Sequence, residues 1–280
     1  MTELARPVER VPRSDAATTR SIRRVQNSNI LSGVIVGATR RGLAAPQRLR
    51  SALLKSIWIE LKRFGAPNVR NIQVSDIVGI DEIRVDGPVL RHSPLVLGAL
   101  CALLDCRTIF EFGTNRGDTA WLLAHNLPEA RLYTLDLSGP EAVESAELEL
   151  TDADEYFRVW DRGARFRGTP EASRITQLFG DSATFDFSPY AGAMDLVYVD
   201  ASHSYSYVKS DTEAALSMLS ASGTIVWDDY THYPGIYAYL NELAPSLDRP
   251  IFHVLGTRLA VYSRRELTGV GPAGPALTRD

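Results

Sequence analysis

The sequence is short of cysteine and of long apolar runs. Its 280 residues include two cysteines, Cys101 and Cys106, so a disulfide framework is not supported and a reducing cytoplasm is expected. No apolar run reaches the roughly 18 residues of a membrane-spanning helix. The longest early stretch, Ile30–Ala38, is followed at once by Arg40 and Arg41, which argues against a cleavable signal peptide. These features favour a globular cytoplasmic protein.

Acidic residues outnumber basic ones outside the first 50 residues. Those residues carry a net charge of +7, so the remainder carries −11 against an overall −4. Since the acidic body lacks a basic stripe with interleaved aromatic residues, nucleic acid is not an expected partner. We expect residues 1–65 to form a basic, partly disordered N-terminal extension with an amphipathic helix near 46–64. Such a helix packs on its own domain or on a second subunit more often than on a membrane, so a homo-oligomer is open.

From residue 66 to 263 the apolar pattern alternates between strands and helices. Strands are expected at 108–112, 131–137, 175–178, 196–199 and 223–227, and helices at 93–104, 118–126 and 235–243. Two closely spaced runs, 251–255 and 259–262, predict a hairpin. The acidic-then-basic stretch 138–168 is too long for a turn and is a lid candidate or a solvated helix. The fold class predicted is α/β, a doubly wound and mostly parallel sheet with a C-terminal antiparallel hairpin. Residues 264–280 are expected to be a disordered tail.

Acidic side chains follow two of the predicted strands. Asp200 ends the run 196–199, with His203 three residues later, and Asp228 and Asp229 end the run 223–227. If the two strands are parallel neighbours, their carboxyl ends lie roughly 5 Å apart. Carboxylates crowded in this way are costly unless a cation sits among them. We therefore predict a metal site at Asp200, Asp228 and Asp229 with His203 as a catalytic base, against the alternatives of a helix cap, a turn and a surface histidine.

A glycine-containing turn follows the strand 108–112. Its spacing, G-x-x-x-G from Gly113 to Gly117, differs from the G-x-G-x-x-G of dinucleotide folds, and Glu111 just before it would be unwelcome beside a pyrophosphate. Asp136 ends the next strand, where a carboxylate can accept both hydroxyls of a ribose, although a helix-capping or turn Asp fits equally well there.

Together these features resemble the class I S-adenosylmethionine-dependent methyltransferases, which have a Rossmann-like fold, over about residues 90–263. The form E-x-G-x-x-x-G-x-[ST] is similar to the cation-dependent O-methyltransferase branch. The resemblance implies that the turn and its neighbours hold the methionine end of S-adenosylmethionine, that Asp136 holds the ribose and that Asp181 and Ser182 contact the adenine. The expected cofactor-binding residues are thus Glu111, Gly113, Thr114, Asn115, Gly117, Asp136, Asp181 and Ser182. Many relatives have a glycine where Asn115 stands.

The D-x-x-H pattern at Asp200–His203, with the acidic pair Asp228–Asp229, is similar to the magnesium-dependent sugar O-methyltransferases of macrolide antibiotic pathways. This resemblance implies Mg²⁺ or another divalent cation as a second cofactor and a small-molecule acceptor, a sugar, glycoside or other metabolite, methylated on a hydroxyl. The alternatives are a metal-independent N-methyltransferase, an NAD-dependent oxidoreductase and a non-catalytic cofactor-binding subunit used for interaction.

Overall fold

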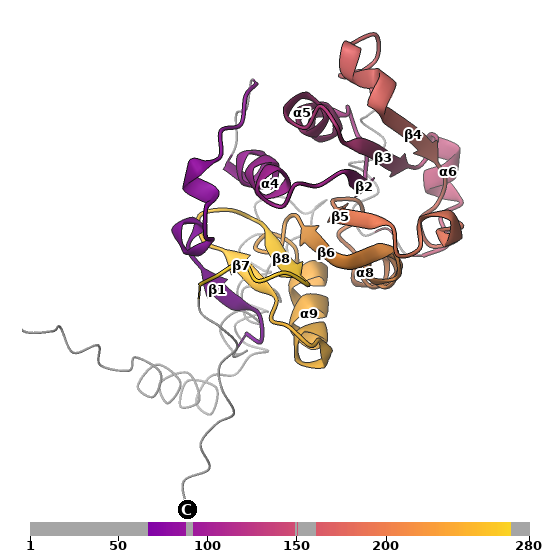
Figure 1. The fold of residues 1–280 in the computed structure, drawn as a ribbon. Helices are drawn as coiled ribbons and strands as arrows, with labels where there is room; N and C mark the ends of the chain where they lie inside the picture. The colour runs from indigo at the N-terminus through magenta and orange to yellow at the C-terminus, as the bar shows by residue number, and fades with distance from the viewer. Residues whose placement is uncertain (1–66, 88–91, 149, 151–160, 270–280) are drawn as a thin grey trace, which may run out of the picture. The chain divides into compact units, whose positions relative to one another are not determined.

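The computed structural model describes residues 67–87, 92–148, 150 and 161–269 (Figure 1). The chain divides into two units, Met1–Pro67 and Asn68–Asp280, and the described strands and helices all belong to the second. The predictions for the basic extension, for the helix near 46–64 and for the last eleven residues of the tail lie outside the described residues.

An eight-stranded sheet in the order β1-β7-β8-β6-β5-β2-β3-β4 forms the centre of the fold. The strands are β1 Arg70–Ile72, β2 Thr108–Phe112, β3 Arg131–Asp136, β4 Ile175–Phe179, β5 Met194–Val199, β6 Leu219–Trp227, β7 Phe252–Val254 and β8 Ala260–Ser263. All neighbouring strands pair in parallel except that β8 runs antiparallel to both β6 and β7. The predicted Rossmann-like α/β sheet with a C-terminal antiparallel hairpin is confirmed.

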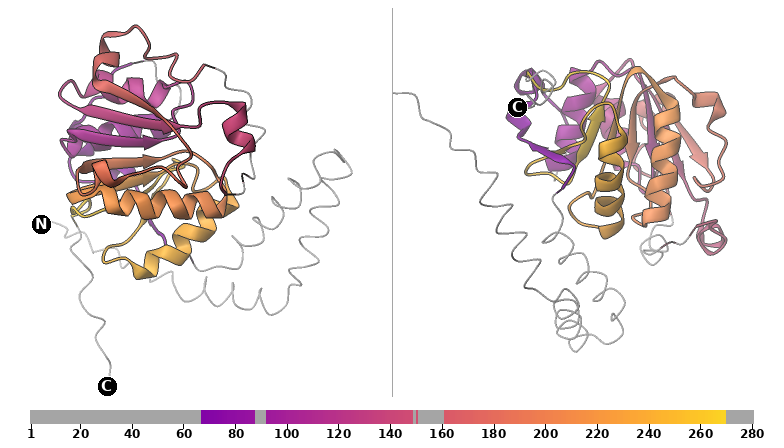
Figure 2. Two further views of the ribbon diagram at one scale, coloured as in Figure 1. Left: turned by 90° about the vertical axis from the view of Figure 1, so that its right-hand side faces the viewer. Right: turned by 90° about the horizontal axis from the view of Figure 1, so that it is seen from below.

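Helices cover both faces of this sheet. The described α-helices are α4 His92–Leu103, α5 Asp118–Asn126, α6 Pro140–Glu144, α8 Tyr205–Met218 and α9 Pro234–Leu243. Helices α4 and α5 lie on one face, and α8 and α9 lie side by side on the other (Figures 1 and 2). Because successive residues of a strand point to opposite faces, Ile109 joins the core with α4 and α5 while Phe110 joins the core with α8 and α9. This two-sided burial explains why the central strands β2 and β5 are mostly apolar and buried along nearly their whole length.

Among the described residues, no helix is both long enough and apolar enough to cross a bilayer.

Strands β5 and β6 are direct parallel neighbours, which meets the condition on which the predicted metal site depended. Val199 pairs with Trp227 at their carboxyl ends, and the Asp228 N–H donates to the Val199 carbonyl at 3.1 Å. Strand β6 starts at Leu219, four residues before the expected start at Gly223, and an irregular register between Met194 and Leu196 absorbs the added length. The pairing sets the acids that follow the two strands side by side.

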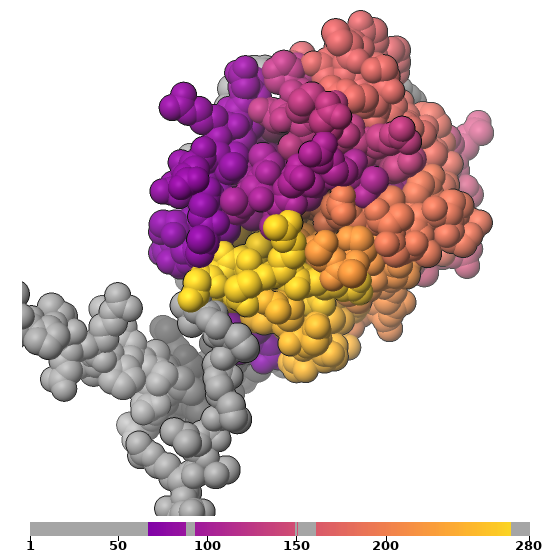
Figure 3. Space-filling model, viewed as in Figure 1, coloured from indigo at the N-terminus to yellow at the C-terminus, as the bar shows by residue number. Residues whose placement is uncertain are grey.

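Residues 264–269, expected to belong to the disordered tail, are packed against the domain. Leu267 is buried in the core with α4 and α5, and Thr268 forms a bridge with Ile77. Arg265 Nη1 donates to the Leu104 carbonyl at 2.6 Å. In the space-filling view, yellow residues near the end of the described chain lie directly against indigo residues near its start (Figure 3). The boundary expected at residue 264 was too early, because the apolar Leu267 still has a core to join.

Replacing Leu123 by alanine tests the core under α5. Leu123 is fully buried, and removing most of a buried leucine side chain destabilises a fold by about 2–5 kcal/mol. We expect urea unfolding of Leu123→Ala to give a lower free energy of unfolding by that amount. The control is Val78→Ala at a side chain that is 65% exposed, with an expected change within about 0.5 kcal/mol. Equal losses in both variants would contradict this description of the core.

Candidate functional site

The site residues predicted from the sequence meet where the parallel strands end. The Asp200 N–H, just past β5, donates to the Phe112 carbonyl at the end of β2 at 3.0 Å. The Gly113 N–H donates to the Leu135 carbonyl of β3 at 2.8 Å. Hydrogen bonds between strands therefore continue into the loops, so the loop after β5 is fixed to the end of β2 and the loop after β2 is fixed to the end of β3. Open parallel sheets bind their ligands at this edge.

The turn after β2 needs its glycines. Gly113 has a φ of +92°, and a Cβ atom there would lie 2.1 Å from the Asp200 carbonyl oxygen. Gly117, with a φ of +84°, precedes α5 and packs against the Phe166 ring. Asn115 also has a positive φ, +46°, which asparagine tolerates better than most residues. The side chain at position 115, a departure from the glycine of many relatives, thus keeps the backbone shape that a glycine would take.

A pocket opens between this turn and the loops after β3, β4 and β5. Four of the expected cofactor-binding residues line it, namely Gly113, Asp136, Asp181 and Ser182. The pocket is also lined by residues for which the sequence indicated no cofactor role: Phe112, Leu135, Leu137, Leu150, Gly180, Ala201, Ser202 and Tyr207. It therefore has both polar groups and apolar walls, as small-molecule sites do.

Tyr207, on α8, fixes one of the polar groups in the pocket. Its hydroxyl lies 3.0 and 2.9 Å from the two Asp181 carboxylate oxygens, and the Ala183 and Glu147 backbone N–H groups donate to the same carboxylate. Asp181 is thus held in one orientation by side-chain and backbone donors. The spacing of Tyr207 in the sequence carried no signal for this contact, because it comes from a helix that packs over the β4 loop.

Glu111 and Thr114 lie beneath the turn and do not line the pocket. Thr134 donates to a Glu111 carboxylate oxygen at 2.5 Å, and the Thr114 and Thr134 hydroxyl oxygens are 2.8 Å apart. Burial raises the pKa of Glu111 to about 8, despite the hydrogen bond from Thr134. Glu111 therefore supports the turn from inside the fold through a buried chain of hydrogen bonds.

Asp136, the expected ribose acid, has two partners. The Asn115 N–H donates to its Oδ2 at 2.8 Å, and Arg162 Nε lies 2.9 Å from its Oδ1. The two side chains of this ion pair are 8% and 6% exposed. Arg162 belongs to the stretch 138–168, for which the sequence predicts only a lid or a solvated helix. Its place beside Asp136 could not be found from spacing in the sequence.

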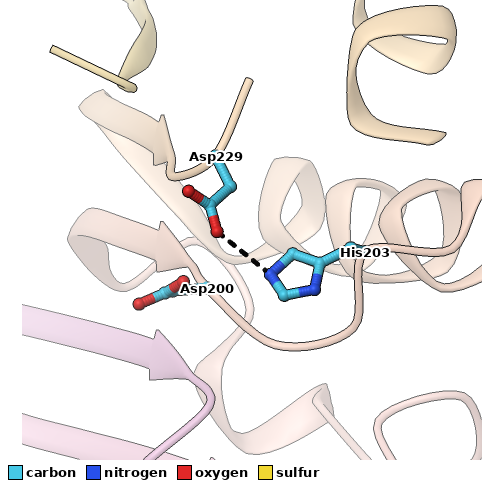
Figure 4. Close-up of side chains that lie close together, drawn as sticks. All are labelled: Asp200, His203 and Asp229. Atoms are coloured by element: carbon cyan, nitrogen blue, oxygen red, sulfur yellow. Dashed lines mark ion pairs between the residues drawn. The ribbon is translucent and has the colours of Figure 1, made fainter. Parts of the chain in front are cut away.

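Asp200, His203 and Asp229 form a compact group beside the pocket (Figure 4). One ligand atom of each lies within 4.8 Å of the others, and His203 Nε2 is 3.3 Å from Asp229 Oδ2. The His203 ring stacks on Tyr233 with centroids 3.7 Å apart and planes 5° apart. Asp229 has a φ of +56°, an uncommon conformation that tends to mark functional sites.

Asp228, predicted as a third metal ligand, is turned toward other partners. Its Oδ1 accepts the Asp229 N–H at 2.7 Å, and its Oδ2 lies 3.4 Å from Arg258 Nη2. Arg258 Nη1 also approaches Asp229 Oδ1, at 2.5 Å. Arg258 comes from the turn between β7 and β8. No motif in the sequence indicated it, because the hairpin returns it to the site from a distant part of the chain.

The positive partners in this group do not offset the repulsion among its carboxylates. Burial, followed by repulsion from Asp228 and Asp229, raises the pKa of Asp200 well above its usual range. Although burial alone would raise it, the hydrogen bond and charge of His203 and the charge of Arg258 leave the pKa of Asp229 below its usual value. A divalent cation would relieve the repulsion at Asp200, and carboxylate oxygens suit a hard cation such as Mg²⁺. The residues present therefore fit such an ion.

The pocket and the acidic group share one short loop. Ala201 and Ser202 line the pocket, and Asp200 and His203 on either side of them belong to the acidic group. Because Gly113 touches the backbone of Asp200, the turn after β2 and the acids after β5 form one site with two adjacent compartments.

The central part of the chain matches a known protein family. Residues 110–230 match the model of a family described as a methyltransferase domain. A curated protein of Sinorhizobium fredii, the uncharacterized protein y4gI, is 26% identical over 204 residues, which cover 68% of this chain and 21% of that protein. The chain spans about a fifth of the length of this relative.

Several solved structures are similar to this chain. A Staphylococcus aureus protein provisionally described as a caffeoyl-CoA O-methyltransferase has a TM-score of 0.47 and 12% identity, covering 66% of this chain and 86% of that one. The Streptomyces achromogenes O-methyltransferase TomG of tomaymycin synthesis, in complex with SAM, has a TM-score of 0.43 and 19% identity, covering 69% and 89%. A Bacillus cereus O-methyltransferase in complex with SAH has a TM-score of 0.40 and 19% identity, covering 62% and 80%.

Gly113→Ala, compared with Gly168→Ala, tests the close approach between the two compartments. Both positions have positive φ, so both variants carry a backbone penalty of about 1–2 kcal/mol. Only the alanine at 113 meets backbone atoms, since nothing lies within 4 Å of the Cβ position at Gly168. We expect urea unfolding to reveal an additional loss of about 1–3 kcal/mol for Gly113→Ala. Equal losses would mean that the Asp200 loop can move away from the turn at no cost.

Proposed function

We propose that this chain, whose residues 110–230 match the model of a methyltransferase domain, transfers a methyl group from S-adenosylmethionine to a hydroxyl oxygen of a small metabolite with the help of a divalent cation. The observation that carries the proposal is the shared loop 200–203. Its middle residues line the pocket, and its end residues belong to the acidic group. A methyl donor in the pocket and an acceptor hydroxyl at the acids would then meet within one site.

The pocket supports the methyl-donor part of this proposal. Gly113 offers open backbone at its wall, and Asp136 is a carboxylate suited to the ribose hydroxyls. Asp181 and Ser182 also line the pocket, and we propose that they contact the adenine. The match of residues 110–230 to a methyltransferase domain favours methyl transfer over hydride transfer from a nicotinamide. The intact acidic group favours an enzyme over a cofactor-binding subunit without activity.

The acidic group supports the role of a cation. Asp200 and Asp229 are the side chains that would hold it, with His203 beside them as the base and with Asp228 and Arg258 behind Asp229. When bound, a divalent cation would supply a Lewis acid that lowers the pKa of an acceptor hydroxyl. The group favours oxygen over nitrogen as the acceptor atom, because a hydroxyl is a poor nucleophile at neutral pH whereas an unprotonated amine needs no such activation.

The chemical step is a direct displacement at the methyl carbon. The acceptor oxygen forms the new C–O bond, the C–S bond of the sulfonium breaks, and the sulfur keeps the electron pair. The hydroxyl proton passes to His203, and the Asp229 carboxylate 3.3 Å from its Nε2 stabilises the imidazolium that forms. The stack on Tyr233 holds the imidazole ring in place for this transfer. Alignment of donor and acceptor by the shared loop supplies the remaining rate enhancement.

The acceptor that we propose is a sugar, a glycoside or another small metabolite with a hydroxyl. The acidic pair after β6 and the D-x-x-H after β5 support this class, because their pattern is similar to that of sugar O-methyltransferases. A sugar with neighbouring hydroxyls suits a site at which a cation and a base lie side by side.

Asp200→Asn tests the role of the cation. The variant keeps the size of the side chain but replaces a carboxylate by an amide, which is a weaker ligand for a hard cation, so we expect the Kd for Mn²⁺ to rise at least about tenfold and Mg²⁺-stimulated methyl transfer to disappear. Binding of S-adenosylhomocysteine, measured by calorimetry, should stay within about threefold of the wild type because the pocket is unchanged. The control is Asp161→Asn, at a side chain that is 68% exposed and pairs with Arg167. Full methyl transfer by the wild type in excess chelator would refute the need for a cation.

The variant His203→Ala distinguishes between two roles of His203, as the base that accepts the hydroxyl proton and as a ligand of the cation. If His203 accepts the proton, turnover should fall by roughly 10²–10⁴ with the Kd for Mn²⁺ nearly unchanged. If His203 instead ligates the cation, the Kd for Mn²⁺ should rise together with the loss of turnover. Both quantities are measured on the same protein, by electron paramagnetic resonance titration and by transfer of a labelled methyl group. A variant with normal turnover would exclude both roles.

A further inference from the structure

Asp136 forms an ion pair with Arg162, and the proposed function assigns a role to Asp136 but none to Arg162. Asp136 lines the pocket, and yet its Oδ1 lies 2.9 Å from Arg162 Nε and its Oδ2 accepts the Asn115 N–H at 2.8 Å. Both side chains of the pair are more than nine-tenths buried. A buried pair of this kind is costly to form and more costly to break on one side, so its presence at a ligand pocket calls for a reason.

The segment that carries Arg162 is joined to the turn after β2. The Gly163 N–H donates to the Asn115 carbonyl and the Arg165 N–H donates to the Arg116 carbonyl, both at 2.9 Å. The Arg165 guanidinium lies over the Trp121 ring of α5, 4.1 Å from its centroid. Residues 161–169 are thus anchored on the turn by backbone and side-chain contacts, which sets where Arg162 can reach.

We propose that Arg162 is a positioning residue of the methyl-donor site, which it serves by holding the Asp136 carboxylate in the orientation that receives the ribose hydroxyls. A carboxylate has about four acceptor positions on its two oxygens. The Asn115 N–H occupies one position on Oδ2, and the Arg162 guanidinium is an ion-pair partner of Oδ1, so each oxygen keeps an acceptor position for a hydroxyl. This inference rests on the proposed function, because it requires a ribose in the pocket.

The opposite role would be a latch, in which Arg162 covers Asp136 and has to leave before the donor binds. The geometry points away from it. Asp136 lines the pocket with Arg162 in place, and the Arg162 side chain is 6% exposed with its backbone segment anchored on the turn. The two roles predict opposite changes in donor affinity when Arg162 is replaced. Loss of a latch would strengthen donor binding, whereas loss of a positioning residue would weaken it.

The test compares S-adenosylhomocysteine with its 2′-deoxy analogue in calorimetric titrations of the full chain. For the wild type we expect the analogue to bind more weakly, because it lacks one hydroxyl for Asp136. In Arg162→Gln, the Kd for S-adenosylhomocysteine should rise about 10- to 100-fold, as expected for the loss of a hydrogen bond to a charged group. The Kd for the analogue should rise less, so that the preference for the 2′-hydroxyl shrinks. A merely structural effect of the substitution would weaken both ligands equally.

Arg162→Lys and Arg107→Gln complete the design. Lysine keeps the charge but not the fixed guanidinium geometry, so we expect it to restore part of the affinity, and it replaces Arg162→Gln in the comparison if that variant does not fold. Arg107 pairs with the exposed Asp105 away from the pocket, and Arg107→Gln should bind both ligands as the wild type does. Unchanged or tighter binding of S-adenosylhomocysteine to both Arg162 variants, or an unchanged preference for the 2′-hydroxyl, would overturn the inference. Failure of the wild type to bind S-adenosylhomocysteine would instead refute the proposed function, and the inference with it.

Discussion

The parallel pairing of β5 with β6 is the constraint on which the site depends. It aligns Val199 with Trp227, so the residues that come after each strand begin at the same level of the sheet. Asp200 and Asp229 thereby come close enough to form one group with His203, and their repulsion is built into the fold. Without this pairing, Asp200 and Asp229 would lie in separate solvent-exposed loops and would not form one group. The core provides the stability that tolerates the crowding, because both faces of these strands are buried.

A second contact joins the acidic group to the pocket. Gly113 lies so close to the Asp200 carbonyl that a side chain would not fit, and this sets the distance between the turn after β2 and the loop after β5. A methyl donor and a hydroxyl acceptor have to be aligned to a fraction of an ångström for a displacement reaction. A glycine contact between two backbone segments is a rigid way to reach that alignment, since no side chain has to choose a rotamer there.

Arginines from outside the motifs complete both compartments. Arg162 approaches Asp136 from the stretch between β3 and β4, and Arg258 approaches Asp228 and Asp229 from the hairpin turn. Each guanidinium balances carboxylates that the strand ends expose, and neither lies in a recognisable pattern of spacing. The acids were predictable because a strand places its last residue at the edge of the sheet. Their partners were not, because they arrive through long connections whose path depends on packing.

Local patterns in the chain predicted the central strands, the helices α4, α5 and α9, the hairpin, the glycine turn and the acids at the strand ends, mostly with boundaries close to those observed. They gave no range for β1, α6 or α8. Periodicity and turn chemistry act over a few residues, so they can be recognised without the fold. The orientations of individual side chains could not: Glu111 lies beneath the turn, Asp228 faces Arg258, and Leu267 belongs to the core. Those orientations depend on which distant segments of the chain pack against each other, and local sequence patterns carry no information about such contacts.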